Sequence, residues 1–171
     1  MERGRAEMYY GTCPPDWSAG VLYVGREACR PGHSWQGVRD HYLLHYVTSG
    51  RGTVRAGRTA YELDRGDIFL YAPGEYLHYT ADETNPWSYL WVGFGGIHAD
   101  ALVAPLAVSA RKPVIPMPYA ESVHDTLTRM LAAIREPRMG VPLQLTGLLY
   151  QLFAMLAERR PAGPDTRTAA S

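Results

Sequence analysis

The residues best suited to chemistry in this sequence are histidines set among strand-like segments. His78 lies near the end of "GDIFLYAPGEYLHYT", a stretch typical of a strand, a tight turn and a second strand. His41 and His45 lie on an earlier strand-like run. A catalytic divalent metal needs imidazoles that converge from neighbouring strands, together with a carboxylate. The first hypothesis to test is therefore a metal-dependent enzyme.

The spacing of these histidines does not fit the metal motifs of small barrels of the cupin type. In the motif P-x-G-x-x-H the ligand falls three residues after the glycine, and Leu77 occupies that position here. His78 is one residue late, and it points to the opposite face because side chains alternate along a strand. The companion motif, H-x-H followed by glutamate, selects Gln36, Val38 and Leu43. We therefore predict no metal and no cofactor, with a metal-dependent isomerase or dioxygenase as the alternative.

The same alternation predicts which side chains face the interior of a barrel. If Leu77 points inward, Tyr79 shares its face, and if Leu43 points inward, so does His45. One face of a later strand, "WSYLWVGF", carries Trp87, Tyr89 and Trp91. Aromatic side chains with a few polar groups suit a small polar ligand that has an apolar face, such as a sugar. The residues alone leave open whether they line a pocket or simply fill a small barrel.

The elements that must position these residues divide into strands and then helices. Residues 42–94 hold short strand-like runs between turn residues, with no intervening helix. Two apolar runs with helical spacing follow, separated by a break at 136–140. The expected fold is mostly β with C-terminal helices. It is a cupin-like antiparallel β-barrel, a jelly roll, followed by an antiparallel helical hairpin.

The second helix, expected from Val141 to Arg160, carries a wider apolar stripe than one packing seam requires. That stripe could pack on the barrel, or it could form a helix–helix interface between two protomers. We predict a homodimer and keep packing on the barrel as the alternative. The residues predicted to dimerise are Leu145, Leu148, Leu149, Leu152, Phe153 and Leu156.

The composition argues against several classes of protein. Lys+Arg and Asp+Glu are equal at 17 each in 171 residues, which argues against a dominant basic surface for nucleic acid. We find no run of about 18 apolar residues and no apolar leader, so we expect no membrane span and no secretory signal. Cys13 and Cys29 lie outside any C-x-x-C spacing, so we expect reduced thiols in a cytoplasmic protein.

The segments "YLLHYVTSGRGTV", "GDIFLYAPGEYLHY" and "PWSYLWVGFGG" occur in this order along the chain. Together they resemble the sensor domain of AraC/XylS transcriptional regulators, over roughly Arg30 to Arg160. The resemblance implies a cupin-like barrel that binds a small effector, often a sugar. It also implies a helical hairpin that dimerises as an antiparallel coiled coil, and an N-terminal arm that closes over the ligand.

The resemblance also implies roles for single residues. It implies that the effector stacks on Trp91 and is contacted by Tyr79, Tyr89 and the arginine of the Arg30-Pro31 pair. The arm would contribute Thr12 and Pro14, and Leu77 stands where a family member has a pocket histidine. With His45 added from the alternation of strand faces, the predicted ligand-binding residues are Trp91, Tyr79, Tyr89, His45, Leu77, Arg30, Pro14 and Thr12.

We therefore expect four segments: an N-terminal arm at 1–20, an effector-binding barrel at 21–118, a hairpin for dimerisation at 119–160 and a linker at 161–171. In the family such a linker leads to two helix-turn-helix units, so DNA binding would belong to a C-terminal domain absent from this sequence. The predicted function is non-enzymatic sensing of a small effector, a carbohydrate by resemblance. A purely structural dimerisation module with a filled barrel is the third alternative.

Overall fold

The structure, a computed structural model, describes residues 3–115, 121–158 and 168–169. Its strands are β1 (Arg5–Tyr10), β2 (Gly20–Ala28), β3 (Ser34–Val38), β4 (Tyr42–Ser49), β5 (Gly52–Ala56), β6 (Thr59–Leu63), β7 (Ile68–Tyr71), β8 (Tyr76–Ala81), β9 (Ser88–Gly95), β10 (Val114–Ile115) and β11 (Thr168–Ala169). Its helices are α1 (Ala99–Val103), the 3₁₀ turn η1 (Ala104–Leu106), α2 (Glu121–Arg135) and α3 (Val141–Ala157). None of the helices in these ranges is long and apolar enough to cross a membrane.

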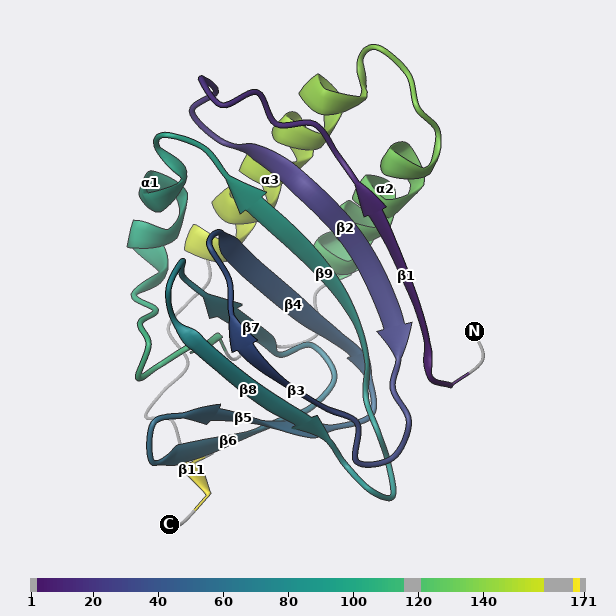
Figure 1. Cartoon of the computed structure of the whole chain (residues 1–171), viewed down its shortest axis with the longest axis vertical. Helices are drawn as coiled ribbons and strands as arrows, with labels where there is room; N and C mark the ends of the chain where they lie inside the picture. The colour runs from purple at the N-terminus through teal and green to yellow at the C-terminus, as the bar shows by residue number, and fades with distance from the viewer. Residues whose placement is uncertain (1–2, 116–120, 159–167, 170–171) are drawn as a thin grey trace.

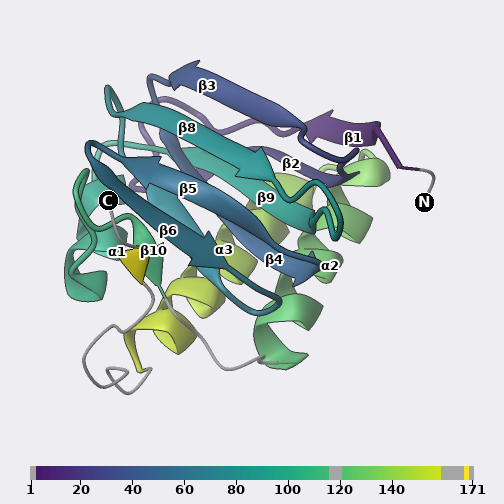
Figure 2. The same cartoon turned by 90° about the horizontal axis from the view of Figure 1, so that it is seen from below.

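The strands form two antiparallel sheets that face each other. The first sheet has the order β1-β2-β9-β4-β7-β10, and the second has the order β11-β6-β5-β8-β3. Figure 1 shows α2 and α3 behind the first sheet, and Figure 2 shows the second sheet on its other side. The layers are therefore sheet, sheet and helices. The predicted fold class, a cupin-like jelly roll followed by a helical hairpin, is confirmed.

The first sheet is buried on both faces and separates two apolar cores. On β9, Tyr89 and Trp91 point into the core between the sheets, whereas Leu90 and Val92 point into the core beneath the helices. This is the period-two alternation that the sequence predicts for the segment. A strand in this sheet therefore contributes alternate side chains to two different environments.

The apolar stripe of α3 packs inside the chain. Phe153 meets Phe94 of β9 with their ring centroids 5.1 Å apart, and Leu149 and Leu152 are fully buried. The whole predicted dimer face is at most 3% exposed: Leu145, Leu148, Leu149, Leu152, Phe153 and Leu156. These side chains are not available to a second protomer, which corrects the prediction. A helix that must cover both a sheet and a partner helix needs a wide stripe, so width alone does not indicate a dimer.

The predicted arm, residues 1–20, begins as an edge strand of the first sheet. β1 pairs antiparallel with β2 along its whole length, from Arg5 opposite Ala28 to Tyr10 opposite Tyr23. At the other end of the chain, most of the predicted linker at 161–171 lies outside the described residues. Its described part, β11, pairs antiparallel with β6.

Candidate functional site

A cavity of about 360 Å³ opens between the two sheets. Residues of one edge strand from each sheet, β1 and β3, line it together with residues of β2, β4, β8 and β9. Its size falls at the lower end of the range usual for small-molecule sites. The predicted barrel interior is therefore only partly filled, and the open part lies toward the edges of the sheets.

His45 of β4 lies at the centre of an aromatic cluster that forms the cavity floor. Its ring stacks on Phe69 of β7, with centroids 4.3 Å apart and planes at 8°, and meets the edge of Tyr89 at 5.1 Å. Burial lowers the pKa of His45 to about 3, with a smaller contribution from the charge of Arg39, so the imidazole is neutral at physiological pH. Its Nδ1 atom has no hydrogen-bond partner within the described chain. A buried polar atom without a partner is costly, so a water or a ligand hydroxyl that reached Nδ1 would supply the missing hydrogen bond.

Trp91 forms a flat wall of the cavity because the strand beside it carries a glycine. Trp91 of β9 lies directly opposite Gly25 of β2 in the ladder, and its indole lies across that glycine. A Cβ atom at Gly25 would overlap the indole ring, so the wall depends on the absence of a side chain there. The flat ring suits the apolar face of a ligand.

The opposite wall comes from the second sheet. Trp35 of β3 stacks on Tyr79 of β8 with centroids 5.9 Å apart and planes at 21°. The guanidinium of Arg39 lies 4.4 Å from the centroid of a Trp35 ring, a cation–π contact. Burial raises the pKa of Tyr79 well above its usual range, so its hydroxyl remains protonated. Arg39 is thus held at the mouth of the cavity by an aromatic ring.

Polar groups gather at the rim. The hydroxyl of Tyr23 lies 2.6 Å from Nε2 of His41, and Nδ1 of His41 lies 2.6 Å from a carboxylate oxygen of Asp40. The hydrogen bond from His41 lowers the pKa of Asp40. On β2, the carboxylate of Glu27 accepts a hydrogen bond of 3.1 Å from the hydroxyl of Tyr89. Donors and acceptors therefore surround an aromatic interior, which is the distribution that a ligand rich in hydroxyl groups requires.

The AraC-like ligand binding domain family matches residues 21–153 of the chain. The chain belongs to this family. It is 33% identical over 151 residues to the raffinose operon transcriptional regulatory protein RafR of Pediococcus pentosaceus, a match covering 85% of this chain and 54% of that protein. It is 31% identical over 148 residues to the Msm operon regulatory protein of Streptococcus mutans, covering 82% and 51%. The chain spans about half the length of these curated relatives.

The crystal structure of the AraC-like transcriptional activator CuxR has the same fold. It superimposes with a TM-score of 0.56 at 17% sequence identity, and the match covers 87% of this chain and 56% of that one. The sequence-based prediction of an AraC-type sensor domain is confirmed at the level of the family by the match of the family model and by the curated relatives.

The AraC-like domain brings half of the predicted ligand-binding residues to its cavity, namely Trp91, Tyr79, Tyr89 and His45. Leu77 is fully buried in the core between the sheets and does not line the cavity. Arg30 is exposed in the turn after β2, and Thr12 is exposed beyond the end of β1. Pro14 lines a separate hollow next to Gly95 and Gly96. These four residues therefore lie outside the cavity lining, so the geometry does not support the effector contacts predicted for them.

The arm of this AraC-like domain reaches the cavity through residues that the sequence did not single out. β1 alternates, so Ala6, Met8 and Tyr10 line the cavity, whereas Thr12 comes after the strand has ended. The rim residues Glu27, Arg39 and His41 were also missed. The run "GVLYVGREA" is rich in strand-forming residues and could have indicated β2, but only its pairing shows that Glu27 faces inward.

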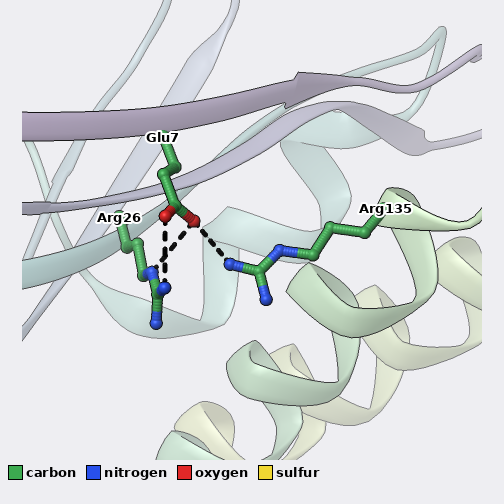
Figure 3. Close-up of polar contacts among 3 residues, drawn as sticks. All are labelled: Glu7, Arg26 and Arg135. Carbon is green, nitrogen blue, oxygen red and sulfur yellow. Dashed lines mark hydrogen bonds and ion pairs between the residues drawn. The ribbon is translucent and has the colours of Figure 1, made fainter. Parts of the chain in front are cut away.

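The outward face of β1 contacts the helical hairpin. Glu7 accepts hydrogen bonds of 3.1 and 3.3 Å from Arg26 of β2, and another from Arg135 at the end of α2 (Figure 3). Both hydrogen bonds lower the pKa of Glu7, and the one from Arg26 has the larger effect. Arg135 also lies 5.5 Å from the ring of Tyr9. The same strand therefore touches the cavity on one side and α2 on the other.

Proposed function

We propose that this chain senses a carbohydrate and transmits its binding to DNA-binding units of a transcriptional regulator. The observation that carries the proposal is the cavity, which combines the open face of Trp91 with Glu27, Arg39 and His41 at its rim. Relatives named for the raffinose operon and the Msm operon support a saccharide as the effector. The family of ligand-binding domains supports sensing rather than catalysis.

A sugar matches this cavity group by group. The apolar face of a pyranose ring would lie on Trp91, and its hydroxyl groups would pair with the carboxylate of Glu27 and the guanidinium of Arg39. Neutral His45 offers Nδ1 at the floor, where a charged imidazole would be costly to bury. The hydroxyl of Tyr89 donates a hydrogen bond to the carboxylate of Glu27 and thereby orients it.

The arm is the proposed route from the cavity to the helices. A ligand touching Ala6, Met8 or Tyr10 adds stability to β1 in its paired position. Glu7 on the other face of the strand then keeps its bond to Arg135 of α2. A ligand that prefers the paired arm thereby also favours one arrangement of the hairpin, which is the differential affinity that an allosteric response needs.

Dimerisation belongs to the same proposal, through a different face of α3 from the one predicted. The exposed residues Leu143, Gly147, Tyr150, Ala154 and Ala157 follow one another at steps of four, three, four and three. This is the spacing of a helix that packs along a second helix, and none of the five is charged. We infer that the occupant of this face is α3 of a second copy of the chain.

The direct test of the cavity is a thermal-shift and calorimetric screen of mono- and oligosaccharides that includes raffinose and lactose. A bound sugar raises the melting temperature by mass action. Trp91→Ala should weaken its affinity about 30-fold, as expected for loss of a buried aromatic anchor worth ~2 kcal/mol. The matched control is Trp17→Ala, in the loop before β2 and outside the cavity. Unchanged affinity in Trp91→Ala would exclude this site.

The dimer is tested by sedimentation at micromolar concentration. The unmodified chain should be a dimer, and Tyr150→Glu should be a monomer because it introduces a charge at the centre of the seam. Ala132→Glu makes the matched change at an exposed position of α2 and should leave the dimer intact. A monomeric unmodified chain, or a dimeric Tyr150→Glu variant, would overturn the proposed face.

A further inference from the structure

Three side chains with metal-binding atoms meet where β2 turns into β3. Glu27, Cys29 and His33 each offer one such atom, and all of these atoms lie within 4.8 Å of one another. Nε2 of His33 lies 3.6 Å from Oε1 of Glu27. A thiol, an imidazole and a carboxylate together form a donor set typical of zinc and similar borderline divalent ions. These positions differ from those of the cupin metal motifs.

The main chain holds the three residues in this arrangement. The pairing of β2 with β9 continues to Cys29, whose N–H donates to the carbonyl of Trp87. Because Glu27 and Cys29 are two residues apart on this extended segment, their side chains share a face. The segment Arg30-Pro31-Gly32-His33 then closes a turn with a bond of 3.1 Å from His33 N–H to the carbonyl of Arg30. Gly32 has φ of 65°, which suits the third position of a type II turn after proline.

The turn that brings His33 back over the strand is also anchored at its far end. The carbonyl of His33 accepts a hydrogen bond of 2.8 Å from the N–H of Ala81 in β8. Arg3 donates to the carbonyls of Cys29 and Pro86, at 3.2 and 3.0 Å. The side chains of the cluster therefore project from backbone that is fixed on both sides.

The Cys29 sulfur is fully buried, next to the indole of Trp87 and the hydroxyl of Tyr89. The Nε1 atom of Trp87, which is fully buried, makes no hydrogen bond within the described residues. A buried N–H donor without an acceptor is costly, and a metal-bound thiolate beside it would supply the acceptor.

We propose that Glu27, Cys29 and His33 bind one zinc-class divalent ion through a carboxylate oxygen, a thiolate and an imidazole nitrogen. The side chain of His33 is 37% exposed, so the ion can enter from solvent on that side. With bonds of about 2.0–2.3 Å, the ligand atoms of a tetrahedral zinc site lie roughly 3.5 Å apart. The separation of Glu27 and His33 already meets this requirement.

The contacts of Glu27 suit this role. The Tyr89 hydroxyl donates to Oε2, whereas Oε1 faces His33, so one oxygen is oriented by a hydrogen bond and the other is available to the ion. Metal-ligating carboxylates are commonly held by such outer hydrogen bonds. Because Glu27 also lines the cavity, the ion would fix a side chain that the ligand contacts.

The test is a titration of reduced, metal-free protein with Co²⁺ and then Zn²⁺. One equivalent of Co²⁺ should produce a sulfur-to-cobalt charge-transfer band that Zn²⁺ abolishes, and Zn²⁺ should raise the melting temperature. Cys29→Ser should remove the band. His33→Gln, in a partly exposed turn, should weaken Zn²⁺ binding more than about 100-fold, beyond the effect of losing an outer contact.

Cys13→Ser and His78→Gln are the matched controls and should bind as the unmodified chain does. The absence of a charge-transfer band, or a band that survives Cys29→Ser, would overturn the proposal. If Cys29→Ser does not fold, His33→Gln decides, and unchanged affinity in that variant refutes the site. The result is independent of the carbohydrate screen, which is run on metal-free protein.

Discussion

The two faces of the first sheet use the same strands for different purposes. The inner face carries aromatic and polar side chains such as His45, Tyr89 and Trp91, and it leaves a cavity. The outer face carries aliphatic side chains together with Tyr46 and Phe94, and it is covered by α2 and α3. The comparison indicates that the larger apolar core lies on the helix side of the sheet and the candidate ligand cavity on the other side. Substitutions on the two faces should therefore have separable effects.

The largest effect on stability is expected from the outer face. Phe153→Ala should lower the free energy of unfolding by about 3–5 kcal/mol, because it removes a buried ring packed against Phe94. Urea denaturation measures the change. Arg129→Ala, at an exposed position of α2 outside the proposed dimer face, should change it by less than about 0.5 kcal/mol. A smaller loss for Phe153→Ala than for Arg129→Ala would contradict the assignment of the outer face.

On the inner face, the buried imidazole of His45 should affect the pH dependence of the free energy of unfolding. The folded state holds the pKa of His45 at about 3, whereas the unfolded chain has an ordinary value near 6.5. Between these values the unfolded state binds more protons, so stability falls as pH decreases from about 6.5 toward 3. The slope from this group is up to ~1.4 kcal/mol per pH unit. His45→Gln should remove that slope in denaturation curves between pH 7 and 4.5; parallel curves would refute the burial of a neutral imidazole.

Carbohydrate binding at the inner face should depend on the pairing of Gly25 with Trp91 between β2 and β9. Gly25→Ala should displace the indole, abolish carbohydrate binding and cost about 1–3 kcal/mol of stability through overpacking. Gly95→Ala is the control, because a methyl group there meets only an ordinary contact with Leu22. Calorimetry and denaturation of both variants would check the prediction. Normal sugar affinity in Gly25→Ala would show that Trp91 does not need this wall.

The smallest effect is expected where β1 joins the inner face to the helices. Glu7→Gln should leave global unfolding nearly unchanged, because the ion pairs of Glu7 are near the surface. It should nevertheless speed hydrogen exchange of the β1 amides, since the strand loses its contact with Arg135. Glu62→Gln on β6 is the control. Equal protection of β1 in both variants would count against Glu7 as a link.

Local patterns in the sequence predicted much of this fold. Alternation along β4 and β9 correctly assigned His45, Tyr89 and Trp91 to the interior, and helical spacing found both α2 and α3. These signals depend on residues near one another in the chain. The face of a strand or helix follows from its period, and the period is visible without knowing the partner.

What the sequence could not predict depends on distant pairing. The stripe on α3 indicated a large apolar contact, but whether the sheet or a second protomer supplied it depends on how the chain returns to the outer face. The inward side of Glu27 follows from its register with Tyr89, 62 residues away. Arg30 was expected in the cavity, whereas it belongs to a turn that directs His33 toward Glu27. Such assignments require knowledge of how strands that are distant in the sequence pair in the folded chain.

The flat contact of Trp91 on Gly25 has a consequence for how this pocket can diverge during evolution. The two positions depend on each other, because the indole ring of Trp91 on β9 needs the space that a side chain at position 25 of β2 would fill. A descendant that replaces the tryptophan with a small residue gains freedom to place a side chain opposite, and could recognise an effector that no longer stacks. A descendant that keeps the ring keeps the glycine. Joint inheritance of the pair should therefore distinguish ring-binding sensors from sensors that have changed their effector class.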